Sequence, residues 1–318
     1  MFLSGGRFNS QGIGIRHYSE NSELRQTTIV DEEIEFDYKF KTDENGFRIT
    51  YSCDIEKPKS IIAIAGDSFT EGQGSSIVWV SKIQKKLCKN KSKTFNTAMG
   101  GYSIIGMQKS LDYAKNSLGA SHSIVAITTG DILRSHAEMI SNENCSVYVS
   151  RTNKCGDSAT WWHFPSNLNN EELINFSKTK FKYGLKEVYK NAKIEIKNKI
   201  RSWENKSPKN KNLYLNTRAM HGISSVYGPK KTLLIIIPTK LDIGLQNKPN
   251  KKKMFSKHLN TFLRKINDDI EVYDLRSCPL TETHFHKKDG HPNEFGQKLI
   301  GECADEIVDI KKFLSVSN

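Results

Sequence analysis

The chain has 318 residues, which is enough for one large domain or two modest ones, each with a buried core. Its 36% hydrophobic residues exclude collagen-like, coiled-coil and membrane-spanning classes. The formal net charge of +13 would attract nucleic acid, an anionic polymer or an acidic membrane surface. Charge is therefore the first feature that a functional account must explain.

The opening stretch, residues 1–58, is polar. It holds a segment of alternating apolar and polar residues at Ile34–Phe40 and a turn signal at Asp43–Gly46. Alternation of this kind is typical of a half-buried strand. We therefore expect an N-terminal arm or hairpin over 1–58 that packs on a main domain over 59–318.

From Ser60 onward, short apolar runs alternate with segments of helical periodicity. The runs lie at 61–65, 94–98, 123–128, 233–237 and 270–274, and helical spacing occurs over 78–87, 105–114 and 255–263. Strands that alternate with helices predict a doubly wound α/β fold around a five-stranded parallel sheet. The functional site of such a fold lies at the carboxyl edge of the strands.

The third and fourth runs lie about a hundred residues apart, far more than a crossover needs, so we expect an insertion at about 135–230. It contains a predicted helix from about Glu171 to Trp203, with a lysine-rich face that is more typical of a solvated surface than of an anionic-polymer site. Trp161 and Trp162 could line an acyl or sugar pocket, and packing of the insertion explains them equally well.

Six cysteines are too few for a disulfide scaffold in this length, and no C-x-x-C pair indicates a zinc ribbon or thioredoxin motif. Cys145 and Cys155 could pair in an oxidising compartment, but free buried thiols are the favoured state. Residues 1–6 hold no run comparable to a signal peptide, and no apolar run elsewhere is longer than a strand. We expect a soluble chain, cytoplasmic by default and extracytoplasmic if an anchor has been removed.

The sharpest local motif is the segment Ala65–Gly72, which follows the first predicted strand directly and precedes a helical pattern. It places Ser68 at the carboxyl end of that strand, and Gly66 and Gly72 allow a tight turn that would expose its hydroxyl. No Gly-Lys-Ser/Thr follows, and the spacing of the glycines fits neither the phosphate-loop nor the dinucleotide fingerprint. A serine nucleophile is the favoured interpretation.

A serine nucleophile needs a base and a group that orients the base. The segment Lys288–Gly296 precedes a helical pattern, and Pro292 suits the first turn of that helix, which leaves His291 on the loop before it. This loop and Ser68 share one edge of the predicted sheet. We expect Ser68 as nucleophile, His291 as general base and acid, and Asp289 as the residue that fixes the imidazole tautomer.

These motifs resemble those of the SGNH (GDSL-type) hydrolases, a family of serine esterases and acyltransferases with a flavodoxin-like α/β fold. Gly66-Asp67-Ser68 is similar to the family's nucleophile block, Asn96–Ser103 to its second block and Asp289–Asn293 to its last. The resemblance covers about Lys59 to the C-terminus. It implies that the backbone N–H groups of Ser68 and Gly101 form the oxyanion hole.

Two positions depart from the family pattern. Gly130 stands where the family has an asparagine whose side chain donates to the oxyanion, and Thr129 or Arg134 are the candidate substitutes. The loss of one such donor can cost about a hundredfold to a thousandfold in rate. Asp289 lies two residues before His291 instead of three, as in relatives that act on polysaccharide O-acetyl groups. If Asp289 points away, a main-chain carbonyl would orient the histidine.

We therefore expect a serine esterase that hydrolyses or transfers O-acyl groups, by resemblance O-acetyl groups of a carbohydrate, with no cofactor and no metal. The rival chemistry is a zinc or iron site at the cluster of His284, His286, Asp289 and His291. A catalytically silent binding or assembly protein of the same fold is the alternative function, and a basic polymer-binding protein is the third. No nucleic-acid-binding motif accompanies the charge, which leaves an anionic glycan or a membrane surface as its expected neighbour.

Overall fold

The computed structural model describes residues 2–4, 15–136, 139–141, 145–148, 161–180, 208–244, 249–266 and 270–315. Its core is a parallel sheet of five strands in the order β11-β10-β6-β4-β5. The strands are β4 (Ser60–Ala65), β5 (Ser92–Asn96), β6 (His122–Thr128), β10 (Thr232–Ile237) and β11 (Glu271–Asp274). Every neighbouring pair is parallel, so the predicted flavodoxin-like sheet is confirmed.

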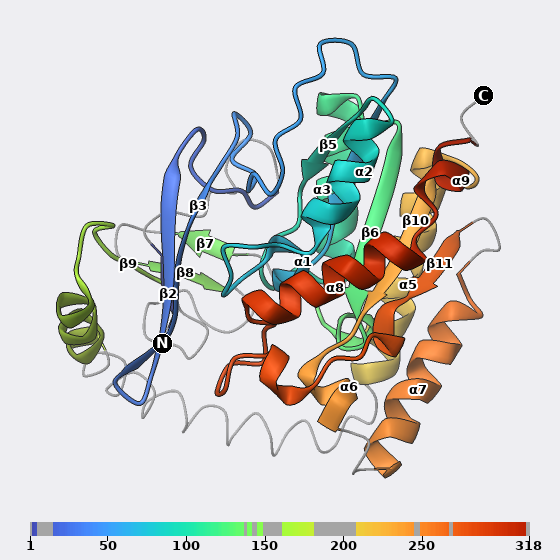
Figure 1. The fold of residues 1–318 in the computed structure, drawn as a ribbon. Coiled ribbons are helices and arrows are strands. Elements are labelled where there is room, and N and C mark those ends of the chain that lie inside the picture. The colour runs from blue at the N-terminus through green and yellow to red at the C-terminus, as the bar shows by residue number, and fades with distance from the viewer. Residues whose placement is uncertain are drawn as a thin grey trace.

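Helices cover both faces of this sheet (Figure 1). Alternate strand residues face opposite layers: Ile62 and Ile64 join one buried cluster, and Ala63 and Ala65 join the other. The first layer contains α2 (Val80–Lys89), α8 (Glu294–Ile307) and α9 (Ile310–Ser315). The second contains α3 (Ile104–Leu118), α5 (Pro208–Tyr227) and α7 (Pro249–Leu263). Buried runs in parallel strands need cover on both sides, which explains their continuous hydrophobicity.

Short helical elements lie in the connections. They are α1 (Ser68–Glu71), η1 (Asp131–Leu133), α6 (Lys240–Gly244), η3 (Leu275–Ser277) and η4 (Glu282–His284). The first two follow β4 and β6 at the carboxyl edge of the sheet. This edge is therefore built from tight turns that end in short helices.

A second sheet joins the N-terminal residues to the insertion. Its order is β3-β2-β1-β9-β8-β7, made from β1 (Phe2–Ser4), β2 (Glu23–Val30), β3 (Glu33–Lys41), β7 (Met139–Ser141), β8 (Cys145–Tyr148) and β9 (Trp161–His163). Strands β2 and β3 form an antiparallel hairpin, where the sequence predicts an arm or hairpin. This sheet lies beside the helix-covered one (Figure 1). The hairpin is thus part of a larger sheet that the sequence did not reveal.

The insertion is described only in part. Residues 170–180 are helical, and the rest of the helix predicted over 171–203, with most of its lysine-rich face, lies outside the described residues, as does Cys155. Within the described ranges, none of the helices combines the length and the apolar run that a bilayer crossing requires.

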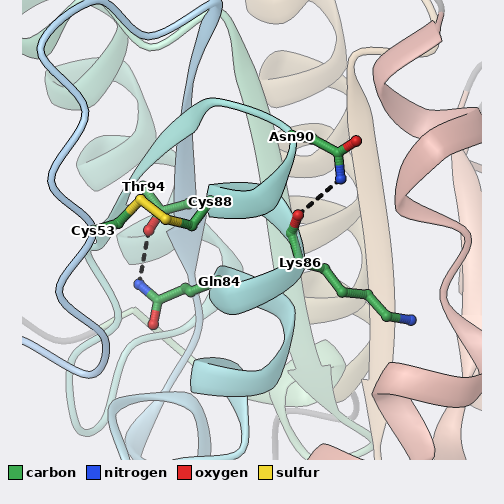
Figure 2. Close-up of a disulfide and its surroundings, with 6 residues drawn as sticks. All are labelled: Cys53, Gln84, Lys86, Cys88, Asn90 and Thr94. Carbon is green, nitrogen blue, oxygen red and sulfur yellow. Dashed lines mark hydrogen bonds between the residues drawn. A yellow bond between two sulfur atoms is a disulfide. The ribbon is translucent and has the colours of Figure 1, made fainter.

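The expectation of free thiols is wrong for the described cysteines: Cys145 is in a disulfide, and so are two pairs elsewhere in the described residues. Cys53 bonds to Cys88 with Cα atoms 6.0 Å apart, and Cys278 bonds to Cys303 with Cα atoms 6.1 Å apart. Figure 2 shows that the first disulfide joins the last turn of α2 to the segment before β4, beside a hydrogen bond from Gln84 to Thr94. The partners are separated by 35 and 25 residues, so no short spacing motif could reveal the pairs.

Candidate active site

The turn after β4 holds Ser68 at the carboxyl edge of the parallel sheet. Strand β4 ends at Ala65, and Asp67 caps α1 by accepting a hydrogen bond from the Phe69 N–H at 2.9 Å. A Cβ atom at Gly66 would lie 2.4 Å from Thr70 Oγ1, so only glycine fits at this point. The serine is 7% exposed and starts the short helix α1.

Ser68, His291 and Asp289 form one hydrogen-bonded chain. The Ser68 hydroxyl donates to His291 Nε2 at 2.7 Å, and His291 Nδ1 donates to the Asp289 carboxylate. The backbone N–H of His291 donates to the same carboxylate at 2.8 Å and folds it back onto the ring. The spacing of two residues is therefore sufficient, and no main-chain carbonyl is needed to orient the imidazole.

Asp289 is held in its ionised form. Burial opposes ionisation, but the hydrogen bond from His291 and the positive charge that this ring can carry outweigh burial and hold the pKa of Asp289 below its ordinary value. An ionised carboxylate at this place fixes the Nδ1–H tautomer and would stabilise an imidazolium on His291.

Two residues of the pocket beside His291 have unengaged backbone N–H groups. Ser68 and Gly101 both line one pocket, and neither N–H donates to an acceptor in the described part of the chain. Gly101 has φ +75°, in the left-handed region that favours glycine. An unengaged pair of donors beside a serine is the arrangement that a developing oxyanion requires.

Gly130 lies at the start of η1 and lines the same pocket. Its φ of −72° suits any residue, and an added Cβ would meet only Thr128 Oγ1, at 3.6 Å. The position therefore has room for a side chain, although the sequence supplies none.

The two substitutes considered for the missing donor also line the pocket, but each has other partners. The Thr129 hydroxyl donates to Asp242 at 3.3 Å. Arg134 donates to Asp67 Oδ2 at 3.2 Å and to the Tyr102 carbonyl at 2.9 Å. Arg134 thus ties the nucleophile turn to the loop that follows Gly101.

The pocket has a volume of about 360 Å³, at the small end of the range for ligand sites. Its walls come from five segments at the carboxyl edge of the sheet, and the lining residues are Ser68, Phe69, Gly101, Thr128, Thr129, Gly130, Arg134, Thr239, Lys240, Leu241, Gly290 and His291. Lys240 donates to the carbonyls of His286 and Lys287, which fixes it at the rim beside the His291 loop.

Trp161 and Trp162 do not line this pocket. They are 6% and 4% exposed and pack in the hydrophobic clusters around β9 of the six-stranded sheet. Their burial matches the alternative role that the sequence allows, which is packing of the insertion. An aromatic pair has the same pattern in either role, so the sequence could not separate the two.

The histidines of the rival metal cluster turn to separate partners. His284 Nδ1 accepts from the Thr281 N–H at 3.0 Å, and His286 Nε2 donates to the Gly74 carbonyl at 2.8 Å. Burial lowers the pKa of His286, which keeps this ring neutral. In the described ranges, no three His, Cys, Asp or Glu residues are arranged to hold a metal ion.

No family model matches the chain, and no curated protein matches it significantly. Solved structures do match. A family 3 carbohydrate esterase from Clostridium thermocellum is 11% identical with a TM-score of 0.42, and the match covers 81% of this chain and 99% of that one. An esterase from Pseudoalteromonas sp. is 16% identical with a TM-score of 0.42, and the match covers 81% of this chain and 100% of that one.

A lipolytic protein of the G-D-S-L family from Veillonella parvula is 16% identical with a TM-score of 0.38, covering 77% of this chain and 96% of that one. The family that the sequence motifs resemble is thus found among the similar structures.

Proposed function

We propose that the protein is a serine-dependent carboxylic-ester hydrolase or O-acyltransferase. The observation that carries this proposal is the hydrogen-bonded chain of Ser68, His291 and Asp289, which ends in a pocket with two unengaged N–H groups. A serine aimed at a histidine would have no structural need for free backbone donors beside it. Acyl transfer requires both.

In the proposed reaction, Ser68 Oγ attacks the ester carbonyl while His291 Nε2 takes the hydroxyl proton. The N–H groups of Ser68 and Gly101 stabilise the oxyanion, and His291 returns the proton to the leaving alcohol. Water, or a second hydroxyl, then attacks the acyl-serine with His291 as base and releases the acid or a new ester. Asp289 stabilises the imidazolium in both steps.

The substrate class in this proposal is an O-acetyl ester of a carbohydrate. The Asp289-x-His291 spacing supports it by resemblance, and a pocket of about 360 Å³ suits a short acyl group better than a long chain. The net charge of +13 supports an anionic glycan or a membrane surface nearby. Turnover of p-nitrophenyl esters should therefore fall from acetate to octanoate, and acetate should be released from an O-acetylated polysaccharide.

The test of the reaction is Ser68→Ala with p-nitrophenyl acetate. We expect a loss of at least about a thousandfold in kcat, since the nucleophile is removed and only the oxyanion donors remain. Ser121→Ala is the matched control, because its hydroxyl donates to the Ile61 carbonyl at the opposite end of the sheet. Equal turnover of the wild-type protein and Ser68→Ala would sink the proposal.

The second candidate is a silent binding or assembly protein of the same fold. Gly130 favours it, because the side-chain donor of the oxyanion hole is absent there. The same assay separates the two: no Ser68-dependent turnover of any ester, together with retained binding of an acetylated glycan, would support the binding protein.

A further inference from the structure

The peptide unit between Gly100 and Gly101 is held from outside the parallel sheet. This unit carries both the Gly100 carbonyl and the Gly101 N–H, and in a planar trans peptide these two groups point in opposite directions. A partner that fixes the carbonyl therefore fixes the direction of the N–H. Glycine on both sides leaves this peptide freer to rotate than any other, so an external partner is needed.

One such partner is Arg16, in the N-terminal arm. Its Nη1 donates to the Gly100 carbonyl at 2.8 Å, and the residue is 4% exposed. The guanidinium lies 4.4 Å from the ring centre of Tyr102, and the Arg16 N–H donates to the Tyr102 hydroxyl at 3.0 Å. The arginine is thus fixed along its whole length against the loop that contains Gly101.

The other side of Gly100 is held by Glu71, three residues after the nucleophile. Glu71 accepts the Gly100 N–H at 2.5 Å and a hydrogen bond from the Tyr18 hydroxyl, which also comes from the arm. Burial raises the pKa of Glu71, while the bond from Tyr18 and the charge of Arg48 oppose this rise. The Gly100 backbone therefore has a buried partner at each end.

We propose that Arg16 is a positioning residue that turns the Gly101 N–H into the oxyanion hole, so that the N-terminal arm completes the active site. This inference rests on the proposed esterase function. It assigns the arm a part in catalysis: without the hydrogen bond from Arg16 to the Gly100 carbonyl, the peptide can rotate and the site loses one oxyanion donor.

The test compares Arg16→Met with Arg16→Lys in p-nitrophenyl acetate hydrolysis. Methionine keeps much of the apolar stem but donates nothing, so kcat should fall about a hundredfold, the cost of one oxyanion donor, with KM changed less than about threefold. Lysine can still donate to the carbonyl and should recover at least about tenfold of that loss. Binding of a trifluoromethyl ketone, which forms a tetrahedral adduct with Ser68, should weaken in proportion to kcat/KM.

Arg25→Met is the matched control. Arg25 is a buried arginine of the same arm, but it bonds to Asp37 within the hairpin and to the Leu168 carbonyl. It should lower stability and leave kcat unchanged. Equal losses of kcat in Arg16→Met and Arg25→Met would show a general effect of destabilisation and overturn the inference.

A crystal structure of Arg16→Met tests the orientation of the Gly100–Gly101 peptide independently of the rate. The Gly100 carbonyl should be rotated or present in two orientations. An unchanged peptide together with wild-type kcat would overturn the positioning role of Arg16 and leave the esterase function standing. Absence of Ser68-dependent turnover in the wild-type protein overturns the esterase function and this inference with it.

Discussion

At the scale of single residues, the proposed oxyanion hole is made by few groups. Ser68 and Gly101 supply backbone donors, and Gly130 supplies no side chain although the pocket has room at its Cβ position. A donor placed there would act on the same oxyanion. The position therefore offers a gain of function by one substitution.

We expect Gly130→Asn to raise kcat by about tenfold, less than the hundredfold or more that an optimised donor contributes, because a newly introduced amide is not preorganised. Gly130→Ala is the control: it adds only the Cβ, which meets Thr128 Oγ1 at 3.6 Å, so its kcat should stay within about twofold of wild type. Initial rates with p-nitrophenyl acetate measure both. If the asparagine variant is no faster than the alanine variant, a side chain at position 130 does not reach the oxyanion, which contradicts the prediction.

The sequence motifs pointed to the proposed catalytic residues, but not to the residues that hold them in place. Ser68, Asp289 and His291 lie in local motifs next to strand and helix ends, where the fold fixes their position. Arg16 and Glu71 are buried charged residues that act through long-range bonds. Glu71 had one available signal, its place three residues after the serine on the same helical turn, and Arg16 had none.

At the scale of elements, the five parallel strands were predictable because buried runs such as 233–237 are continuously apolar. Strands β7, β8 and β9 were not, because they have three or four residues each, and β9 pairs far along the chain, with Trp161 beside Phe2. Periodicity carries no information on such pairings. The same limit hid the disulfides, because Cys88 of α2 pairs with Cys53 in the segment before β4, and Cys303 of α8 pairs with Cys278 after η3.

Each disulfide should stabilise the fold by about 3 to 4 kcal/mol, the loop-closure entropy for separations of 35 and 25 residues. In urea unfolding, the double variants Cys53→Ser/Cys88→Ser and Cys278→Ser/Cys303→Ser should each show a free energy of unfolding lower by this amount. Four reactive thiols at these positions in the denatured, unreduced protein would contradict the pairs.

At the scale of the whole molecule, the two sheets share one interior. A single hydrophobic cluster contains Tyr38 and Phe40 of the hairpin together with Ala63 and Val125 of the parallel sheet. Buried Arg48 bridges the same boundary, with bonds to the carbonyls of Gly72 at 2.8 Å and Ser75 at 2.6 Å. Neither sheet can be exposed without opening the core of the other, so we expect them to unfold together.

The tryptophans allow this cooperativity to be measured, because Trp79 lies in the core of the parallel sheet and Trp162 in that of the second sheet. Two variants, each with the other three tryptophans changed to phenylalanine, leave one of these probes. Within each variant, the urea midpoint by fluorescence should equal the midpoint by far-ultraviolet circular dichroism, as a two-state transition requires. A Trp162 midpoint well below the circular-dichroism midpoint would mean that the second sheet opens first. In that case activity should disappear with the Trp162 signal, since Arg16 and Tyr18 would leave the Gly100 loop before the parallel sheet unfolds.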